Sequence, residues 1–281
     1  MAWSEPLFIF FVLLFLVHLE KFLANRDTTS FVILSLSAAL ACLTRYIGVT
    51  LILSGTLALL FLRQDGAKVK LSSLVLFVLL SAMPIGIWAV RNYAVSGTLF
   101  GPRASSVYTL PQNVEFAFSA LISWYFPSRI SGHRSVLMLI GASVGFLAGF
   151  TAKGNLTKLR NAIPRIGAIA LFAAIYTAFM IFSSTTTAYD QIGDRLLSPI
   201  YIPVTLFLLT LAENLLEPFR ERFSPQVVNV LLVVVTAMWL LYYPVRNTAS
   251  DTANRMQQGG GGTAVKHGRR ARWSNIFSNI R

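Results

Sequence analysis

Segment 183–198 carries two carboxylates and an arginine just before an apolar run, and these residue types can bind phosphate groups or metal ions. Asp190 and Asp194 are four residues apart, so a helical turn would place both on one face. Arg195 follows directly, and a guanidinium can bind phosphate through two parallel hydrogen bonds, which lysine cannot do as specifically. A divalent-metal site would need more ligands, and neither histidine nor glutamate lies nearby. The segment therefore favours phosphate binding and no cofactor is expected, with a divalent metal as the less favoured alternative.

A second arginine-containing segment, 88–103, offers two more candidates for anion binding. Arg91 directly follows an apolar run, where a snorkelling side chain that anchors a helix at the membrane surface is an equally good interpretation. Arg103 follows Gly101 and Pro102, which predict a rigid turn beyond the helix. Anchoring explains Arg103 less well than it explains Arg91.

Long apolar segments determine the expected fold class. Of the 281 residues, 55% are hydrophobic and 12% are charged, and the mean hydropathy is +0.63. An apolar run of about 17–25 residues is long enough to cross a bilayer as a helix. We therefore expect an all-α, polytopic transmembrane bundle with about eight spans, at 7–23, 31–43, 47–62, 71–90, 136–152, 166–182, 200–216 and 227–243.

The second and third expected spans are short because Arg45 divides them. One helix over 31–62 would place Arg45 in the middle of the membrane, at a cost of about 2.5–3.5 kcal/mol or more for an isolated arginine. Two short, tilted helices with Thr44, Arg45 and Tyr46 at the surface avoid this cost, and a re-entrant pair is the alternative.

The net charge of +13 indicates orientation and contact with anionic headgroups rather than nucleic acid binding. No basic run is interleaved with aromatic residues except near the C-terminus. The single cysteine, Cys42, excludes an internal disulfide framework. The sequence contains no phosphate-binding Walker loop, no dinucleotide-binding glycine motif after a strand and no nucleophile elbow.

The distribution of cations predicts which side of the membrane each loop faces. The short loops 24–30, 63–70, 153–165 and 217–225, with the adjoining Lys21, carry eleven cations. The loops on the other side carry six, and the C-terminal tail carries seven. Short cationic loops stay on the cytoplasmic side, so both termini and the loops 91–134 and 183–198 are expected to face outward. The basic tail argues for the opposite orientation.

The chain divides into two expected parts. Residues 1–243 form the transmembrane bundle with its outward loops, and residues 244–281 form a short polar, basic tail. The tail contains a flexible tether at 259–262 and then apolar residues at helical spacing, which predict a short amphipathic helix at a headgroup surface or, alternatively, a disordered basic end.

Four stretches of the sequence, taken together, resemble the polytopic glycosyltransferases of the GT-C class. The nearest similarity is to the bacterial RgtA/B/C/D-like and dolichyl-phosphate-mannose-protein mannosyltransferase-like group. The stretches are Ser-Glu-Pro-Leu at 4–7, Leu-Thr-Arg-Tyr-Ile-Gly at 43–48, the segment 88–103 that begins Trp-Ala-Val-Arg-Asn-Tyr, and Asp-Arg-Leu-Leu-Ser-Pro-Ile-Tyr-Ile-Pro at 194–203. Each is weak alone, and their order over about 200 residues carries the resemblance.

The resemblance implies a multi-pass protein of the bacterial inner membrane that transfers a sugar from a polyprenyl-phosphate donor to an acceptor on the outer face. Such a reaction needs a carboxylate base and cations that stabilise the departing phosphate. Arg45 and Arg195 are the leading candidates for the phosphate. Arg91, Arg103 and Tyr46 are further candidates for donor contacts.

The catalytic carboxylate departs from the family pattern. Members of this group carry an acidic residue in a first outward loop, and that loop precedes everything that matches this sequence. Glu5, Asp190 and Asp194 are the remaining candidates for the base. The resemblance thus implies a C-terminal membrane portion that works with a missing N-terminal half or a partner subunit.

Two other classes of function stay open at the level of the sequence. The first is a transporter or flippase for a lipid-linked sugar, although no repeat relates the two halves of the chain. The second is a non-catalytic membrane subunit that binds lipid phosphate and assists a partner.

Overall fold

The computed structural model describes residues 4–62, 71–99, 101, 103–125 and 156–220, and seven isolated positions between 230 and 252; the side chains of 156–166 and 211–220 are not described. Over these ranges every regular element is a helix. The chain divides into two compact units, Met1–Phe219 and Arg220–Arg281. The helices described next belong to the first unit. The domain boundary expected at residue 243 remains a prediction.

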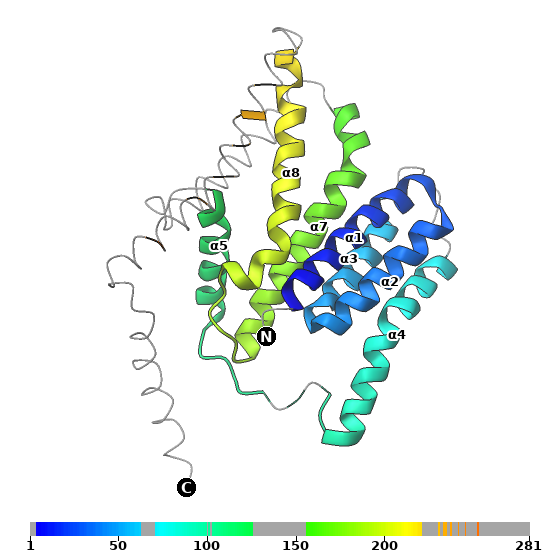
Figure 1. Ribbon diagram of the computed structural model, residues 1–281, viewed down its shortest axis with the longest axis vertical. Coiled ribbons are helices and arrows are strands. Elements are labelled where there is room, and N and C mark those ends of the chain that lie inside the picture. The colour runs from blue at the N-terminus through cyan, green and yellow to red at the C-terminus, as the bar shows by residue number, and fades with distance from the viewer. Residues whose placement is uncertain are drawn as a thin grey trace. The chain divides into compact units, whose positions relative to one another are not determined.

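Helices α1 (Ser4–Asn25) and α2 (Thr28–Thr44) pack side by side and are joined by two residues (Figure 1). Arg26 adopts a positive φ of 56°, and its N–H bonds the carbonyl of Phe22 at 3.0 Å, which ends α1. Asp27 then begins α2, because its carboxylate accepts a hydrogen bond of 2.7 Å from the N–H of Ser30. The same hydrogen bond lowers the pKa of Asp27.

Helix α2 ends before Arg45 and a new helix begins shortly after it, as the sequence predicted. Arg45 is extended (φ −150°, ψ 136°), a short 3₁₀ turn η1 (Tyr46–Gly48) follows, and α3 (Val49–Phe61) begins directly after it. Gly48 packs against the end of α2: a Cβ there would lie 2.5 Å from the nitrogen of Cys42. This close approach requires glycine and sets the direction in which α3 leaves the turn.

Helix α4 (Leu71–Ser96) is longer than the sequence predicted. The expected start of the loop at residue 91 is wrong, since Arg91 lies inside the helix. The helix ends at Gly97, which adopts a positive φ of 69° and donates its N–H to the carbonyl of Tyr93 at 2.9 Å. The glycine, and not the charge at Arg91, terminates α4.

Helices α5 (Leu110–Tyr125), α7 (Leu156–Thr186) and α8 (Asp194–Arg220) complete the described part of the first unit. Helix α7 packs against α1, α3 and α5. The expected loop 183–198 is shortened to 187–193, because α7 continues to Thr186 and α8 already begins at Asp194. Asp190 therefore precedes α8, and the prediction that one helical turn holds both Asp190 and Asp194 is wrong.

Three described helices are long and apolar enough to cross a membrane: Ser4–Asn25, Leu71–Ser96 and Gly167–Thr186. The segments Thr28–Thr44 and Tyr46–Phe61 are shorter apolar helices. The expected span 200–216 lies within α8, which is not among the three. The expected span 136–152 lies wholly outside the described residues, and 227–243 lies mostly outside them. The structure therefore supports a helical membrane protein, while the count of eight spans remains a prediction.

Helix α4 carries the widest exposed apolar face. Only 17% of its most apolar window is buried inside the protein. The exposed large hydrophobic side chains along it are Leu71, Val75, Leu76, Leu79, Leu80, Met83, Ile87, Val90, Tyr93 and Val95. A continuous surface of this kind is unfavourable in water and is expected of a helix that contacts lipid.

Candidate anion-binding site

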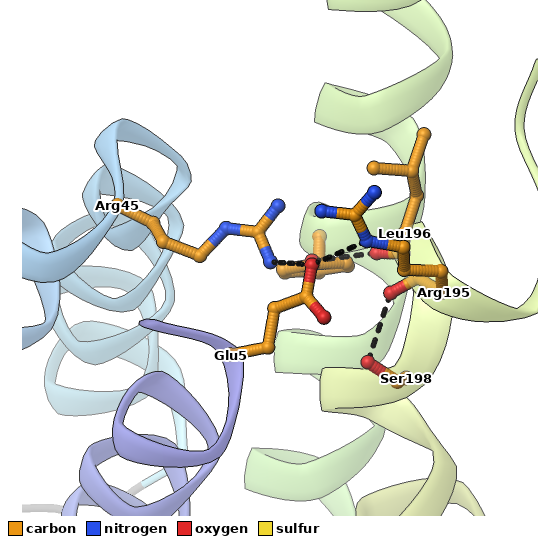
Figure 2. A network of polar contacts seen from close by, with 6 residues as sticks. Glu5, Arg45, Arg195, Leu196 and Ser198 are labelled. Atoms are coloured by element: carbon orange, nitrogen blue, oxygen red, sulfur yellow. Dashed lines mark hydrogen bonds and ion pairs between the residues drawn. The ribbon is translucent and has the colours of Figure 1, made fainter. Parts of the chain in front are cut away.

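Three charged residues from distant parts of the sequence meet at one carboxylate. The Oε1 atom of Glu5 accepts a hydrogen bond of 2.8 Å from Nε of Arg195. The same oxygen lies 3.2 Å from Nη1 of Arg45. Figure 2 shows the two guanidinium groups approaching Glu5 from opposite sides. We call Glu5, Arg45 and Arg195 the Glu5 cluster.

Each member of the Glu5 cluster sits at an end of a helix. Glu5 lies in the first turn of α1, Arg45 directly follows α2, and Arg195 lies in the first turn of α8. Helix ends are where a polar group on a membrane helix can reach the headgroup region. The placement of Arg195 corrects the sequence-based interpretation, in which it preceded its helix.

The Glu5 cluster combines partial burial with unused hydrogen-bonding capacity. The side chains of Glu5 and Arg45 are 17% and 22% exposed, whereas that of Arg195 is 63% exposed. The Nη1 atom of Arg45 is buried and has no hydrogen-bond partner among the described residues, so its contact with Glu5 is an ion pair alone. Two cations share one anion, and each guanidinium has five N–H donors. The arginines of the cluster therefore have donors with which to bind another anion.

Helix α5 holds the beginning of α8 and so positions Arg195. The indole Nε1 of Trp124 donates to Oδ1 of Asp194 at 3.1 Å. The ring of Tyr201 packs edge-on against Trp124 and stacks on Tyr125, with centroids 5.2 Å and 6.2 Å apart. The hydroxyl of Tyr125 lies 3.0 Å from that of Thr205, and burial raises the pKa of Tyr125 to about 12. Tyr125 is thus a neutral hydrogen-bonding group at ordinary pH.

Helix α7 supplies a buried tyrosine beside the Glu5 cluster. The side chain of Tyr176 is fully buried, and its hydroxyl donates to the carbonyl of Leu196 at 2.8 Å. Tyr176 lies close enough to Glu5 and Arg45 to interact with both charges. It therefore fixes the first turn of α8 against α7 next to Arg195.

A second arginine is held by aromatic rings instead of a carboxylate. The guanidinium carbon of Arg103 lies 5.6 Å from the ring centroid of Tyr46 and 5.8 Å from that of Tyr189. Nη1 of Arg103 also donates to the hydroxyl of Tyr189 at 2.5 Å. The ring of Tyr46 packs in turn against Trp88, with centroids 5.2 Å apart. We call Arg103, Tyr46 and Tyr189 the Arg103 clasp.

The predicted site residues thus fall into three groups. The structure brings Glu5, Arg45 and Arg195 together, and it places Arg103 with Tyr46 in the clasp. Asp194 lies next to Arg195 but contacts Trp124. Arg91 and Asp190 are exposed, and in the described ranges neither contacts the Glu5 cluster. No group of three or more histidine, cysteine, aspartate or glutamate residues gathers to hold a metal ion within those ranges.

Three residues that matter for the geometry were not among the site residues predicted from the sequence: Trp124, Tyr176 and Tyr189. The hydrogen-bond partner of each residue is distant in sequence, between 20 and 86 residues away. A single sequence carries no information on such pairings.

No protein-family model, no curated protein and no solved structure matches this chain. The resemblance to GT-C glycosyltransferases therefore rests on the four sequence stretches alone. The features that bear on function are the geometry of the Glu5 cluster and the apolar helices α1 and α2 next to it.

Proposed function

We propose that this chain is a multi-pass membrane protein that binds a polyprenyl-phosphate sugar at the Glu5 cluster and transfers the sugar to an acceptor hydroxyl at the membrane surface. The observation that carries the proposal is that Arg45 and Arg195, from helix ends far apart in sequence, share one carboxylate oxygen of Glu5.

The apolar helices support a lipid as the ligand. Three helices are of spanning length, and one of them, α1, carries Glu5; the exposed face of α4 fits contact with acyl chains. Arg45 directly follows an apolar helix, and a guanidinium at the end of a membrane helix can reach the phosphate of a lipid headgroup. A phosphate attached to a long apolar chain satisfies both environments at once.

The arginines support a phosphate as the group recognised. Guanidinium groups bind phosphate through parallel hydrogen bonds, and charge-assisted bonds of this kind are about twice as strong as neutral ones. The Glu5 cluster carries one more positive than negative charge. Arg195 is largely exposed and can turn toward a ligand from the surface.

The proposed reaction uses these groups in a single displacement. The acceptor hydroxyl attacks the anomeric carbon, and the bond from that carbon to the phosphate oxygen breaks. The polyprenyl phosphate leaves with the electron pair, and Arg45 and Arg195 stabilise its growing charge. A carboxylate takes the proton of the hydroxyl, and Glu5 is the carboxylate nearest to both arginines. Asp194 is the second candidate.

The proposal also includes the number of spans, the membrane and the orientation of the chain. They are eight spans, a bacterial inner membrane, and outward-facing termini with the Glu5 cluster on the outer side. The mutual contact of Arg103 and Tyr46 favours a structural role for both, and their assignment to donor binding stays a prediction.

The first test measures donor binding and turnover in nanodiscs with a radiolabelled polyprenyl-phosphate sugar. Arg45→Gln and Arg195→Gln should each weaken donor binding by about 10-fold or more, since a hydrogen bond to a charged group contributes about 1.5–3 kcal/mol. Lys21→Gln removes one exposed cation from α1 and serves as the matched control.

The outcomes separate the competing functions. Transfer of the label to an acceptor would support the glycosyltransferase. Binding with movement of the donor between leaflets, but no transfer, would indicate a flippase. Binding alone would indicate a donor-binding subunit, and unchanged binding in both arginine variants would rule out the site.

A further inference from the structure

We infer that Glu5 is a built-in competitor of the lipid phosphate: the two anions bind the same guanidinium groups, so that phosphate binding releases Glu5 for proton transfer. The inference rests on the proposed function and adds the order of events at the same site. Its support lies in which donor atoms Glu5 engages and in how weakly it holds them.

Glu5 occupies donor atoms that a phosphate would also use. Glu5 accepts from Nε of Arg195, and this atom belongs to the edge of the guanidinium fork that binds phosphate bidentately. Glu5 also lies against Nη1 of Arg45. A phosphate that uses these edges must therefore take the place of the carboxylate.

The contact between Glu5 and the two arginines is weak enough to be displaced. A single oxygen of Glu5 serves both arginines, and the buried Nη1 of Arg45 makes no hydrogen bond within the described part of the chain. Arg195 is 63% exposed, so solvent screens its ion pair with Glu5. A phosphate offers several oxygens at tetrahedral positions and can bond both arginines separately. The exchange therefore favours the phosphate.

Once displaced from the arginines, the carboxylate of Glu5 can act as a base. While Oε1 accepts from Nε of Arg195 and is ion-paired with Nη1 of Arg45, this oxygen is directed at the two arginines. After exchange, Glu5 lies beside the bound phosphate and can accept the proton of the acceptor hydroxyl as the new carbon–oxygen bond forms. The bond between the anomeric carbon and the phosphate then breaks, and the phosphate carries away the electron pair. Donor binding thus prepares the base, and a hydroxyl is activated only when a donor is present.

The test measures the dissociation constant of polyprenyl phosphate without a sugar, for the full chain in nanodiscs. Glu5→Gln should bind about 10-fold more tightly than the native protein, which corresponds to about 1.4 kcal/mol, because the competing charge is gone. The same variant should lose sugar transfer. Glu115→Gln, which removes an exposed carboxylate on α5, should change neither quantity.

The direction of the change decides the inference. If Glu5→Gln weakens phosphate binding as the arginine variants do, Glu5 organises the arginines and the competition is overturned, while the proposed function stands. If the native protein binds no polyprenyl phosphate, the proposed function fails. Glu5→Asp covers the case in which Glu5→Gln does not fold: it keeps the charge but withdraws it from the arginines, so binding should again tighten, and weaker binding would overturn the inference.

Discussion

The Glu5 cluster and the Arg103 clasp hold arginines in two different ways, although neighbouring residues build both. Arg45 belongs to the cluster and Tyr46, the next residue, to the clasp. Arg195 and Tyr189 are likewise close in sequence. A carboxylate partner can be exchanged for another anion, whereas two aromatic faces hold a cation without offering such an exchange. The cluster is thus suited to a ligand and the clasp to fixing loops.

The largest effect on this comparison is expected from Gly48→Ala, because Gly48 ends the turn that carries both Arg45 and Tyr46. The new Cβ would lie 2.5 Å from Cys42 N and 2.6 Å from Ala41 C, and both atoms are backbone. We expect a loss of about 1–3 kcal/mol in the free energy of unfolding and a strong loss of phosphate binding. Thermal unfolding in detergent and a binding titration measure the two effects.

Gly86→Ala is the matched control for this substitution. Gly86 lies in α4, and nothing lies within 4 Å of the position that its Cβ would take. Alanine there should leave stability unchanged or raise it by up to about 1 kcal/mol. If both variants had the same stability and phosphate binding, the turn would accommodate the added methyl group. The Glu5 cluster and the Arg103 clasp would then not depend on the close packing at Gly48.

An intermediate effect, confined to the Glu5 cluster, is expected from Trp124→Phe. The substitution keeps a ring against Tyr201 but removes the N–H that bonds Asp194 at the start of α8. Arg195 then loses part of its positioning, and phosphate binding should weaken about two- to fivefold, as expected for a hydrogen bond of about 0.5–1 kcal/mol. Ser123→Ala, on the neighbouring residue of α5, should leave binding unchanged. A Trp124→Phe protein with native affinity would show that α8 begins correctly without α5.

The smallest effect is expected from Tyr189→Phe in the Arg103 clasp. Phenylalanine keeps the ring over Arg103 and removes only the hydroxyl that accepts its hydrogen bond. Because the pair is exposed, stability should fall by about 1 kcal/mol or less, and phosphate binding should stay within twofold of native. A tenfold loss of binding in the same titration would instead place the clasp in the donor site and restore Arg103 and Tyr46 as ligand contacts.

The sequence predicted those features of the fold that depend on large local energies. The break at Arg45 follows from the cost of placing an isolated arginine inside a membrane, and the helix was found to end there. The end of α4 and the start of α8 were missed. Gly97 ends α4 through its positive φ, and α8 begins at Asp194, where the carbonyl of Gly193 accepts the N–H groups of Leu196 and Leu197. The sequence-based boundaries lie next to Arg91 and after Arg195 instead.

The candidate site was predictable as a set of residue types and not as an arrangement. Glu5, Arg45 and Arg195 were named because of their chemistry and their positions near helix ends. Their meeting at one oxygen joins residues 190 positions apart, which depends on how α1, α2 and α8 pack. Asp190 carries a carboxylate like Glu5 and lies much nearer to Arg195 in sequence, yet it lies outside the cluster.

The extended backbone at Arg45 makes chain length at this turn as important as residue type. An extended residue directs its side chain away from that of its neighbour, so Arg45 reaches Glu5 while Tyr46 reaches Trp88 and Arg103. Inserting or deleting one residue before Arg45 would exchange the two directions and present a ring to Glu5 and a cation to Trp88. The number of residues before the turn therefore determines which side chain faces Glu5 and which faces Trp88.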